Sequence, residues 1–172
     1  VKFGEHLKNK QRSIVESFLN KKIQYLNDNI SFLRKGIIHN DGNDYNIITD
    51  DKGGAIGIID FGDMVYSYIA SEPAIAMAYV SIDSKDPLFH MAFILKGFHK
   101  FYKLTDAELR FTIYLVCLRL SISVTMSNYR SRLFPNNTYL KVSEDRAWNF
   151  LKKMYKENLE EWGDKLLYYA KS

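Results

Sequence analysis

The sequence predicts a mainly helical α+β domain that carries one small β-hairpin. Two short apolar runs, residues 36–38 and 55–59, lie on either side of a polar segment that contains the turn signal Asp-Asp-Lys-Gly-Gly at 50–54. Most of the remaining chain has apolar residues at helical spacing. The 172 residues, 47% of them hydrophobic, are enough for one domain with its own core. Because no linker interrupts the pattern, we expect residues 1–172 to form a single domain.

The first half of the chain is expected to contain one helix and the hairpin. The helix covers about residues 10–27, where apolar side chains recur every three to four positions. The apolar run at 36–38 is a strand that leads into a polar loop. A short strand at 47–49, the tight turn and a returning strand at 55–59 then complete the hairpin.

Helices are predicted for most of the chain after the hairpin. Their starts carry capping signals: Ser71 as an N-cap, Pro87 in a first turn, Thr105 with Glu108 as a capping box, and Ser143 as an N-cap. The predicted helices cover about residues 72–82, 86–102, 105–128 and 143–169, with a loop at 130–138.

Two polar motifs belong to the hairpin region. Residues 39–46, His-Asn-Asp-Gly-Asn-Asp-Tyr-Asn, fit the pattern H-x-D-x-x-x-x-N, and residues 58–63 are an apolar strand end followed by Asp-Phe-Gly-Asp. Both patterns belong to the kinase signature set, in which the first is the catalytic loop and the second ends a metal-binding strand. The alternative is a polar hairpin with incidental acidic residues, and the occurrence of both motifs around one hairpin disfavours it.

The residue types in these motifs suit phosphoryl transfer, which requires mainly positioning and charge neutralisation from the protein. Asp41 can orient an acceptor hydroxyl and take up its proton, so it is the predicted catalytic base. Asn46 and Asp60 offer hard oxygen ligands that the hairpin would bring close together, and they are the predicted Mg²⁺ ligands. Phosphate oxygens and water would complete the metal shell.

Two residues beside the predicted ligands have supporting roles. His39 is expected to be a buried scaffold residue that hydrogen-bonds the loop backbone rather than a proton shuttle. Asp63 has three readings that the sequence leaves open: a partner of a metal ligand, a second metal ligand, or an N-cap for the following segment.

Three residues outside the motifs are candidates for an acceptor pocket. Arg119 lies within an apolar helix, and a buried arginine must be paired or face a cleft. It could hold a substrate carboxylate bidentately, or it could form a structural ion pair with Glu72 or Asp63. Glu72 could meet a substrate ammonium or be a favourable charge at a helix start. Tyr79 could form part of an aromatic wall for a cationic amine, although ordinary packing is the alternative.

On these residues the sequence resembles the aminoglycoside phosphotransferase and choline kinase family, which is related to protein kinases. The stretches 59–66 and 72–79 narrow the resemblance to hydroxylysine kinase-like proteins and to the phosphotransferase domain that some bacteria fuse to a class III aminotransferase. The later stretches 116–120, 123–124, 139–144 and 147–148 are similar to the second of these groups. The resemblance covers about residues 30–155 and implies the C-terminal, catalytic lobe of a kinase-like fold. It implies the same roles for Asp41, Asn46 and Asp60, with ATP as the co-substrate.

The resemblance also predicts a nucleotide-covering lobe, whose sequence patterns we do not find in this chain. Kinases need a nucleotide-covering lobe with a Gly-rich loop and a strand lysine, and residues 1–38 contain neither pattern. We therefore expect the N-terminal lobe to be absent from this chain and the isolated chain to bind ATP weakly and turn over little. No long activation segment follows Asp63, which favours a small-molecule acceptor over control by activation-loop phosphorylation.

Composition limits the other functional classes. The net charge of +4 is spread along the chain without a basic stripe of interleaved aromatic residues, so no nucleic-acid partner is expected. The apolar run from 111 to 127 has Arg119 at its centre, so a buried helix is expected rather than a membrane span. The single cysteine, Cys117, suits a reducing compartment, and we expect a cytoplasmic protein.

The function predicted from the sequence is ATP- and Mg²⁺-dependent transfer of a γ-phosphate to a hydroxyl group. The acceptor would be a small amine or amino acid, such as hydroxylysine, an amino alcohol or an aminoglycoside. The alternative is a non-catalytic, kinase-like module that binds a substrate or partner for a larger fused enzyme. A protein kinase acting on Ser or Thr is the third reading.

Overall fold

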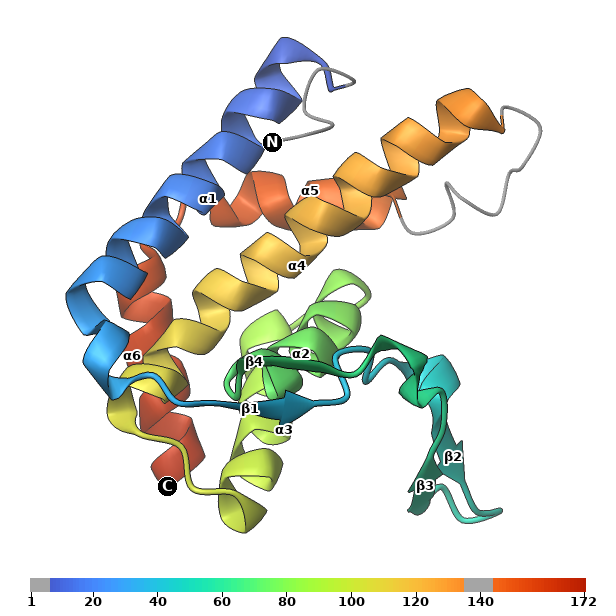
Figure 1. The fold of residues 1–172 in the computed structure, drawn as a ribbon, viewed down its shortest axis with the longest axis vertical. Helices are drawn as coiled ribbons and strands as arrows, with labels where there is room; N and C mark the ends of the chain where they lie inside the picture. The colour runs from blue at the N-terminus through green and yellow to red at the C-terminus, as the bar shows by residue number, and fades with distance from the viewer. Residues whose placement is uncertain (1–6, 135–143) are drawn as a thin grey trace.

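The computed structural model describes residues 7–134 and 144–172 (Figure 1). Most of this part is helical, which confirms the predicted fold class. The helices are α1 (Asn9–Asn29), α2 (Ser71–Ile82), α3 (Pro87–Phe101), α4 (Asp106–Leu133), α5 (Glu144–Met154) and α6 (Leu159–Lys171). The strands are β1 (Lys35–Ile38), β2 (Ile47–Thr49), β3 (Ala55–Ile58) and β4 (Val65–Tyr68), with 3₁₀ turns η2 (Ile30–Phe32), η3 (Asp44–Asn46) and η4 (Phe61–Asp63).

Helix α4 lies at the centre of the helical body and contacts α1, α2, α5 and α6. Phe111, Ile113, Val116 and Cys117 on this helix are fully buried. By length and composition α4 could also cross a membrane, but 67% of its most apolar stretch is buried inside the protein. This burial is what the sequence predicted for the helix, which packs in the core of the helical body.

The strands form two separate antiparallel pairs. The predicted hairpin is confirmed as β2 and β3, with Ile47 opposite Ile58, and it projects from the helical body in Figure 1. The second pair joins β1 to β4, with Ile38 opposite Val65. No element was predicted at β4, because its partner strand lies about 30 residues earlier and only the folded chain brings the two together.

Three helix boundaries differ from their predictions. Ser71 is the first residue of α2 rather than its N-cap, and Ala70 at the cap position makes no side-chain bond. Helix α4 continues to Leu133, into the expected loop. The predicted final helix is two helices, because the side chain of Asn158 accepts from the main-chain N–H groups of residues 160 and 161 and starts α6. Ser143, the predicted N-cap of that final helix, and residues 135–138 of the expected loop lie outside the described residues.

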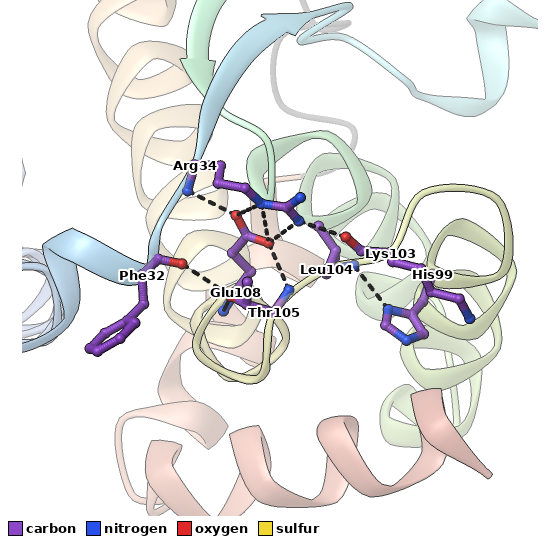
Figure 2. Close-up of polar contacts among 7 residues, drawn as sticks. All are labelled: Phe32, Arg34, His99, Lys103, Leu104, Thr105 and Glu108. Atoms are coloured by element: carbon purple, nitrogen blue, oxygen red, sulfur yellow. Dashed lines mark hydrogen bonds and ion pairs between the residues drawn. The ribbon is translucent and has the colours of Figure 1, made fainter.

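An ion pair between the buried Glu108 and the partly exposed Arg34 ties the start of β1 to the start of α4 (Figure 2). The predicted capping box is confirmed: Glu108 N donates to Thr105 Oγ1 and Thr105 N donates to Glu108 Oε2. Glu108 is fully buried and also accepts from Arg34 N (2.8 Å) and Arg34 Nη2 (2.6 Å). The Thr105 hydroxyl donates to the carbonyl of Phe32. These contacts fix the strand that leads into the first motif.

Burial and hydrogen bonding shift the pKa of Glu108 in opposite directions. Desolvation alone would raise the pKa of this carboxyl. The hydrogen bonds from the Arg34 side chain and from the main chain at Thr105 and Arg34 outweigh it, so the pKa of Glu108 lies below its ordinary value. The carboxylate is therefore charged and paired inside the fold.

Candidate active site

His39 is the first residue after β1 and holds the two motifs together. Its side chain is 8% exposed, and its Nε2 donates to the carbonyl oxygen of Ile59 (2.9 Å), directly before Asp60. Its ring also packs edge-on against Phe61 at a centroid distance of 5.0 Å. This is the placement that the predicted scaffold role requires.

Glu72 binds the backbone of the first motif. Its Oε2 accepts from His39 N (2.6 Å) and from Asn40 N (3.2 Å). Asn40 has a left-handed backbone with φ 67°, which turns the chain sharply out of β1. The carboxylate that was expected to meet a substrate ammonium, or to be a simple helix-start charge, therefore holds the turn that presents Asp41.

Asp41 lies at the centre of a hydrogen-bond network. Its Oδ2 accepts from Asn43 Nδ2 and from Asn46 Nδ2, both at 3.0 Å. Its Oδ1 accepts from Arg119 Nη2 at 2.8 Å. The Asp41 side chain is 20% exposed, so it is oriented from within the protein and still open to a ligand.

The same contacts orient the amide of Asn46. Its Nδ2 donates to the main-chain oxygen of Asp41 (2.8 Å) as well as to the carboxylate. The amide nitrogen therefore points toward Asp41, and the amide oxygen, which is the atom that would bind a metal, points elsewhere. Asn43 supports this arrangement, because its Oδ1 accepts from Tyr45 N and Asn46 N. The sequence analysis did not single out Asn43, although Asn is a preferred cap residue.

The hairpin brings the second predicted ligand to the first. Ile59 N donates to the main-chain oxygen of Asn46 (3.0 Å). Asp60 directly follows Ile59, so this bond brings it close to Asn46. Asp60 is exposed and left-handed, with φ 63°, and its carboxylate accepts weakly from Gly62 N. Among the described residues no group of three or more His, Cys, Asp or Glu side chains could hold a metal ion. A metal site here depends on the pair Asn46 and Asp60.

Asp63 contacts the first motif through its backbone. Its main-chain oxygen accepts from Asn40 Nδ2 (3.2 Å), and its side chain is exposed. The residue is followed by strand β4 and not by a helix, so the N-cap reading is wrong. The backbone contact links Asp63 to the loop that carries Asp41.

Arg119 reaches the site from α4. It pairs with Asp41 and with neither Glu72 nor Asp63, the two partners that the sequence analysis considered. Its Nη2 also donates to the hydroxyl of Tyr79 (3.0 Å), a residue of α2. Its Nε is buried and has no hydrogen-bond partner among the described residues. The helical spacing of apolar residues placed Arg119 in the core but could not show that α4 passes beside the loop that carries Asp41.

A groove with a volume of about 590 Å³ opens beside this network. Gly42 and Asn43 line it from the loop that carries Asp41, and Tyr79 of α2 and Asp83, directly after α2, line it from the other side. On the far wall Asp83 forms an ion pair with Arg146 of α5. Two further grooves, around Tyr25 between α1, α4 and α6, include none of the motif residues. The groove beside Asp41 is therefore the candidate acceptor site.

Comparison with known proteins agrees with this geometry. The chain is 34% identical to a hydroxylysine kinase from Mus musculus over 161 residues, which are 88% of this chain and 43% of that protein. It is 33% identical to a hydroxylysine kinase from Xenopus laevis, over 84% of this chain and 41% of that protein. The chain thus spans less than half the length of these relatives.

A solved structure shows the same fold. The structure of amicoumacin kinase in complex with AMP-PNP and Ca²⁺ superposes with a TM-score of 0.61 and 18% sequence identity, over 93% of this chain and 51% of that chain. Residues 5–104, which include both motifs, match the description "Phosphotransferase enzyme family". This match confirms the family resemblance drawn from the motifs, and the chain belongs to the phosphotransferase enzyme family.

Proposed function

We propose that this chain is the catalytic lobe of an ATP-dependent small-molecule kinase that phosphorylates a hydroxyl of a small amine or amino acid. The observation that carries the proposal is the Asp41 network, in which a half-buried carboxylate is fixed from three directions at the edge of a groove. The relatives named hydroxylysine kinase support an amino acid acceptor. Because the chain spans less than half of those relatives, the proposed activity belongs to a longer protein that also supplies a nucleotide-covering lobe.

The geometry leaves Asp41 able to act on an acceptor hydroxyl. A carboxylate offers about four acceptor positions, and Asn43, Asn46 and Arg119 occupy three of them. The remaining position can accept a hydrogen bond from the substrate hydroxyl, orient its oxygen toward the phosphate and take up the proton. Fixing the carboxylate in advance is the protein's main contribution, since this reaction depends on positioning.

The residues present fit a divalent metal such as Mg²⁺. The Asn46 amide is held with its oxygen directed away from Asp41, and Asp60 offers an exposed carboxylate on the adjacent strand end. These two oxygens would hold the ion, and the ion would neutralise charge on the transferred phosphoryl group. The backbone bond from Ile59 to Asn46 keeps the two positions in register.

The test is ATP consumption by the parent protein, with its upstream segment present, in Mg²⁺ and with a panel of hydroxy amino acids, amino alcohols and aminoglycosides. We expect Asp41→Asn to keep nucleotide binding and lose most turnover, and Asp60→Ala to lose metal-dependent nucleotide binding. Asp51→Asn is the matched control, because this substitution makes the same chemical change at an exposed position in the turn of the hairpin. Undiminished turnover in Asp41→Asn would reject the proposal.

The same experiment separates the kinase from the alternative of a non-catalytic binding module. A binding module would bind an acceptor, or Mg²⁺ with ATP, without consuming ATP for any compound in the panel. Turnover that depends on Asp41 but not on Asp51 would instead establish both the reaction class and the acceptor.

A further inference from the structure

Arg119 lies where it could contact a bound acceptor. It is a half-buried cation that contacts Asp41, while its second partner, Tyr79, lines the candidate acceptor groove. The guanidinium is therefore at the junction of the catalytic carboxylate and the groove.

The hydrogen bonds of Arg119 are incomplete in this structure. Nη2 donates to both Asp41 and Tyr79, whereas the buried Nε donates to no described residue. A buried donor without a partner is unfavourable. A carboxylate that bound side-on would accept from Nε and Nη2 together, which is the bidentate geometry that arginine favours. Such a ligand would satisfy Nε and compete with Asp41 for Nη2.

We propose that Arg119 recognises the carboxylate of an amino acid acceptor and, by exchanging Asp41 for that carboxylate, opens a second position on Asp41 beside the one that is already free for the acceptor hydroxyl. The inference rests on the proposed function and narrows its substrate class from hydroxylated amines to hydroxylated amino acids. Without a carboxylate, Arg119 stays on Asp41, and the acceptor has only the one open position and no anchor on Arg119. Aminoglycosides and simple amino alcohols are therefore poorer acceptors.

The groove contains a second arginine, and it supplies the control. Arg146, on the far wall, pairs with Asp83, and both side chains are about half exposed. It could attract a carboxylate by charge, but it makes no contact with Asp41. Arg119→Lys and Arg146→Lys are therefore matched variants: each keeps a positive charge and removes the bidentate donor pair.

The experiment compares 5-hydroxylysine with its decarboxylated counterpart, which keeps the hydroxyl and both amines, as acceptors for the parent protein. We expect a preference for the carboxylated acceptor of about 10- to 100-fold in kcat/KM, as one or two charge-assisted hydrogen bonds provide. Arg119→Lys should lower kcat/KM for both acceptors, because the variant loses the guanidinium that donates to Asp41, and it should lower kcat/KM more for hydroxylysine, which removes most of the preference. Arg146→Lys should keep it. An equal rate with both acceptors in the unmodified protein, or loss of the preference in Arg146→Lys alone, would overturn the inference.

Calorimetric titration without ATP separates this inference from the proposed function. If neither acceptor is phosphorylated, the kinase proposal fails, but Arg119-dependent binding of the carboxylated compound still supports the inference. Equal binding of the two compounds, or binding unchanged by Arg119→Lys, contradicts it. Should Arg119→Lys fail to fold by circular dichroism, Tyr79→Phe is the substitute variant, because it removes the hydroxyl that orients the guanidinium and keeps the ring. It should reduce the same preference, and an unchanged preference counts against the inference.

Discussion

Replacing Glu108 by glutamine should destabilise the chain far more than an ordinary loss of one surface charge. Glu108 is fully buried, and its two oxygens accept from Arg34 N, Arg34 Nε, Arg34 Nη2 and Thr105 N at 2.6–3.0 Å. Glutamine has the same shape but one acceptor oxygen. Its NH₂ group would face either Arg34 N or Thr105 N, and each of these main-chain donors is bonded to Glu108, whereas Arg34 Nη2 keeps the carbonyl of Lys103 as an acceptor.

The expected loss follows from those contacts. A hydrogen bond to a charged group contributes about 1.5–3 kcal/mol, and an unsatisfied buried donor costs about 1–3 kcal/mol. The Arg34 side chain is 45% exposed, so water recovers part of its contribution. The two main-chain donors bind different oxygens of Glu108, so one of them loses its acceptor and carries most of the effect, and we expect the free energy of unfolding to fall by about 2–4 kcal/mol. For a chain of this size that corresponds to a fall of about 4–16 °C in Tm.

The assay is thermal and urea unfolding followed by far-ultraviolet circular dichroism. Asp164→Asn is the control, because Asp164 also pairs with an arginine, Arg110, at 2.6 Å, but both side chains are exposed (62% and 40%). An exposed pair contributes about 0–1 kcal/mol. If the two variants lose the same stability, burial does not decide the strength of the Glu108 contacts and the reasoning is wrong.

The remaining predictions concern pH, the catalytic loop and two local backbone features. The pKa of Glu108 lies below its ordinary value of 4.5, so its stabilisation is complete above that value and is lost as the pH falls through the lowered pKa. Unfolding titrations should show this acid-induced loss, and it should be smaller in Glu108→Gln. Glu72→Ala should lower kcat of the parent protein about tenfold or more, because two loop N–H groups lose their acceptor; steady-state kinetics that match the wild type would contradict this. Asn158→Ala should cost about 1 kcal/mol in urea unfolding through the loss of the α6 cap. Asn40→Ala should cost about 1–2 kcal/mol more than Asn40→Gly, since both lose the same side-chain bond and only glycine accepts φ 67° without strain; equal unfolding midpoints would reject the strain argument.

Features of the fold that depend on nearby residues could be predicted from the sequence. The β2–β3 hairpin followed from two apolar runs around an Asp- and Gly-rich turn, and the start of α4 followed from Thr105 and Glu108. The break between α5 and α6 could not be predicted, because the apolar spacing continues through residues 155–158 and this segment contains no Pro or Gly. There the single cap residue Asn158 decides the local structure.

Features that depend on distant residues could not be predicted in the same way. The motif spacing placed Asp41, Asn46 and Asp60 together, because one hairpin connects them. The partners that fix the loop come from α2 and α4, as Glu72 and Arg119, and no local pattern encodes which residue of a helix faces a loop 30 or 80 positions earlier. For Arg119 the sequence could state only that a buried cation needs a partner.

These distant partners explain how the loop keeps its conformation. Asn40 and Asp60, one in each motif, have left-handed backbones, a conformation that persists in non-glycine residues only where the surroundings fix it. Around Asn40 the fixing groups are the Glu72 carboxylate and the carbonyl of Asp63. Around Asp60 the two neighbouring contacts are the His39 bond to Ile59 and the Gly62 N–H. The helical body therefore fixes the backbone of the loop that carries Asp41, and a substitution of Glu72 in α2 should alter the proposed catalysis through that backbone.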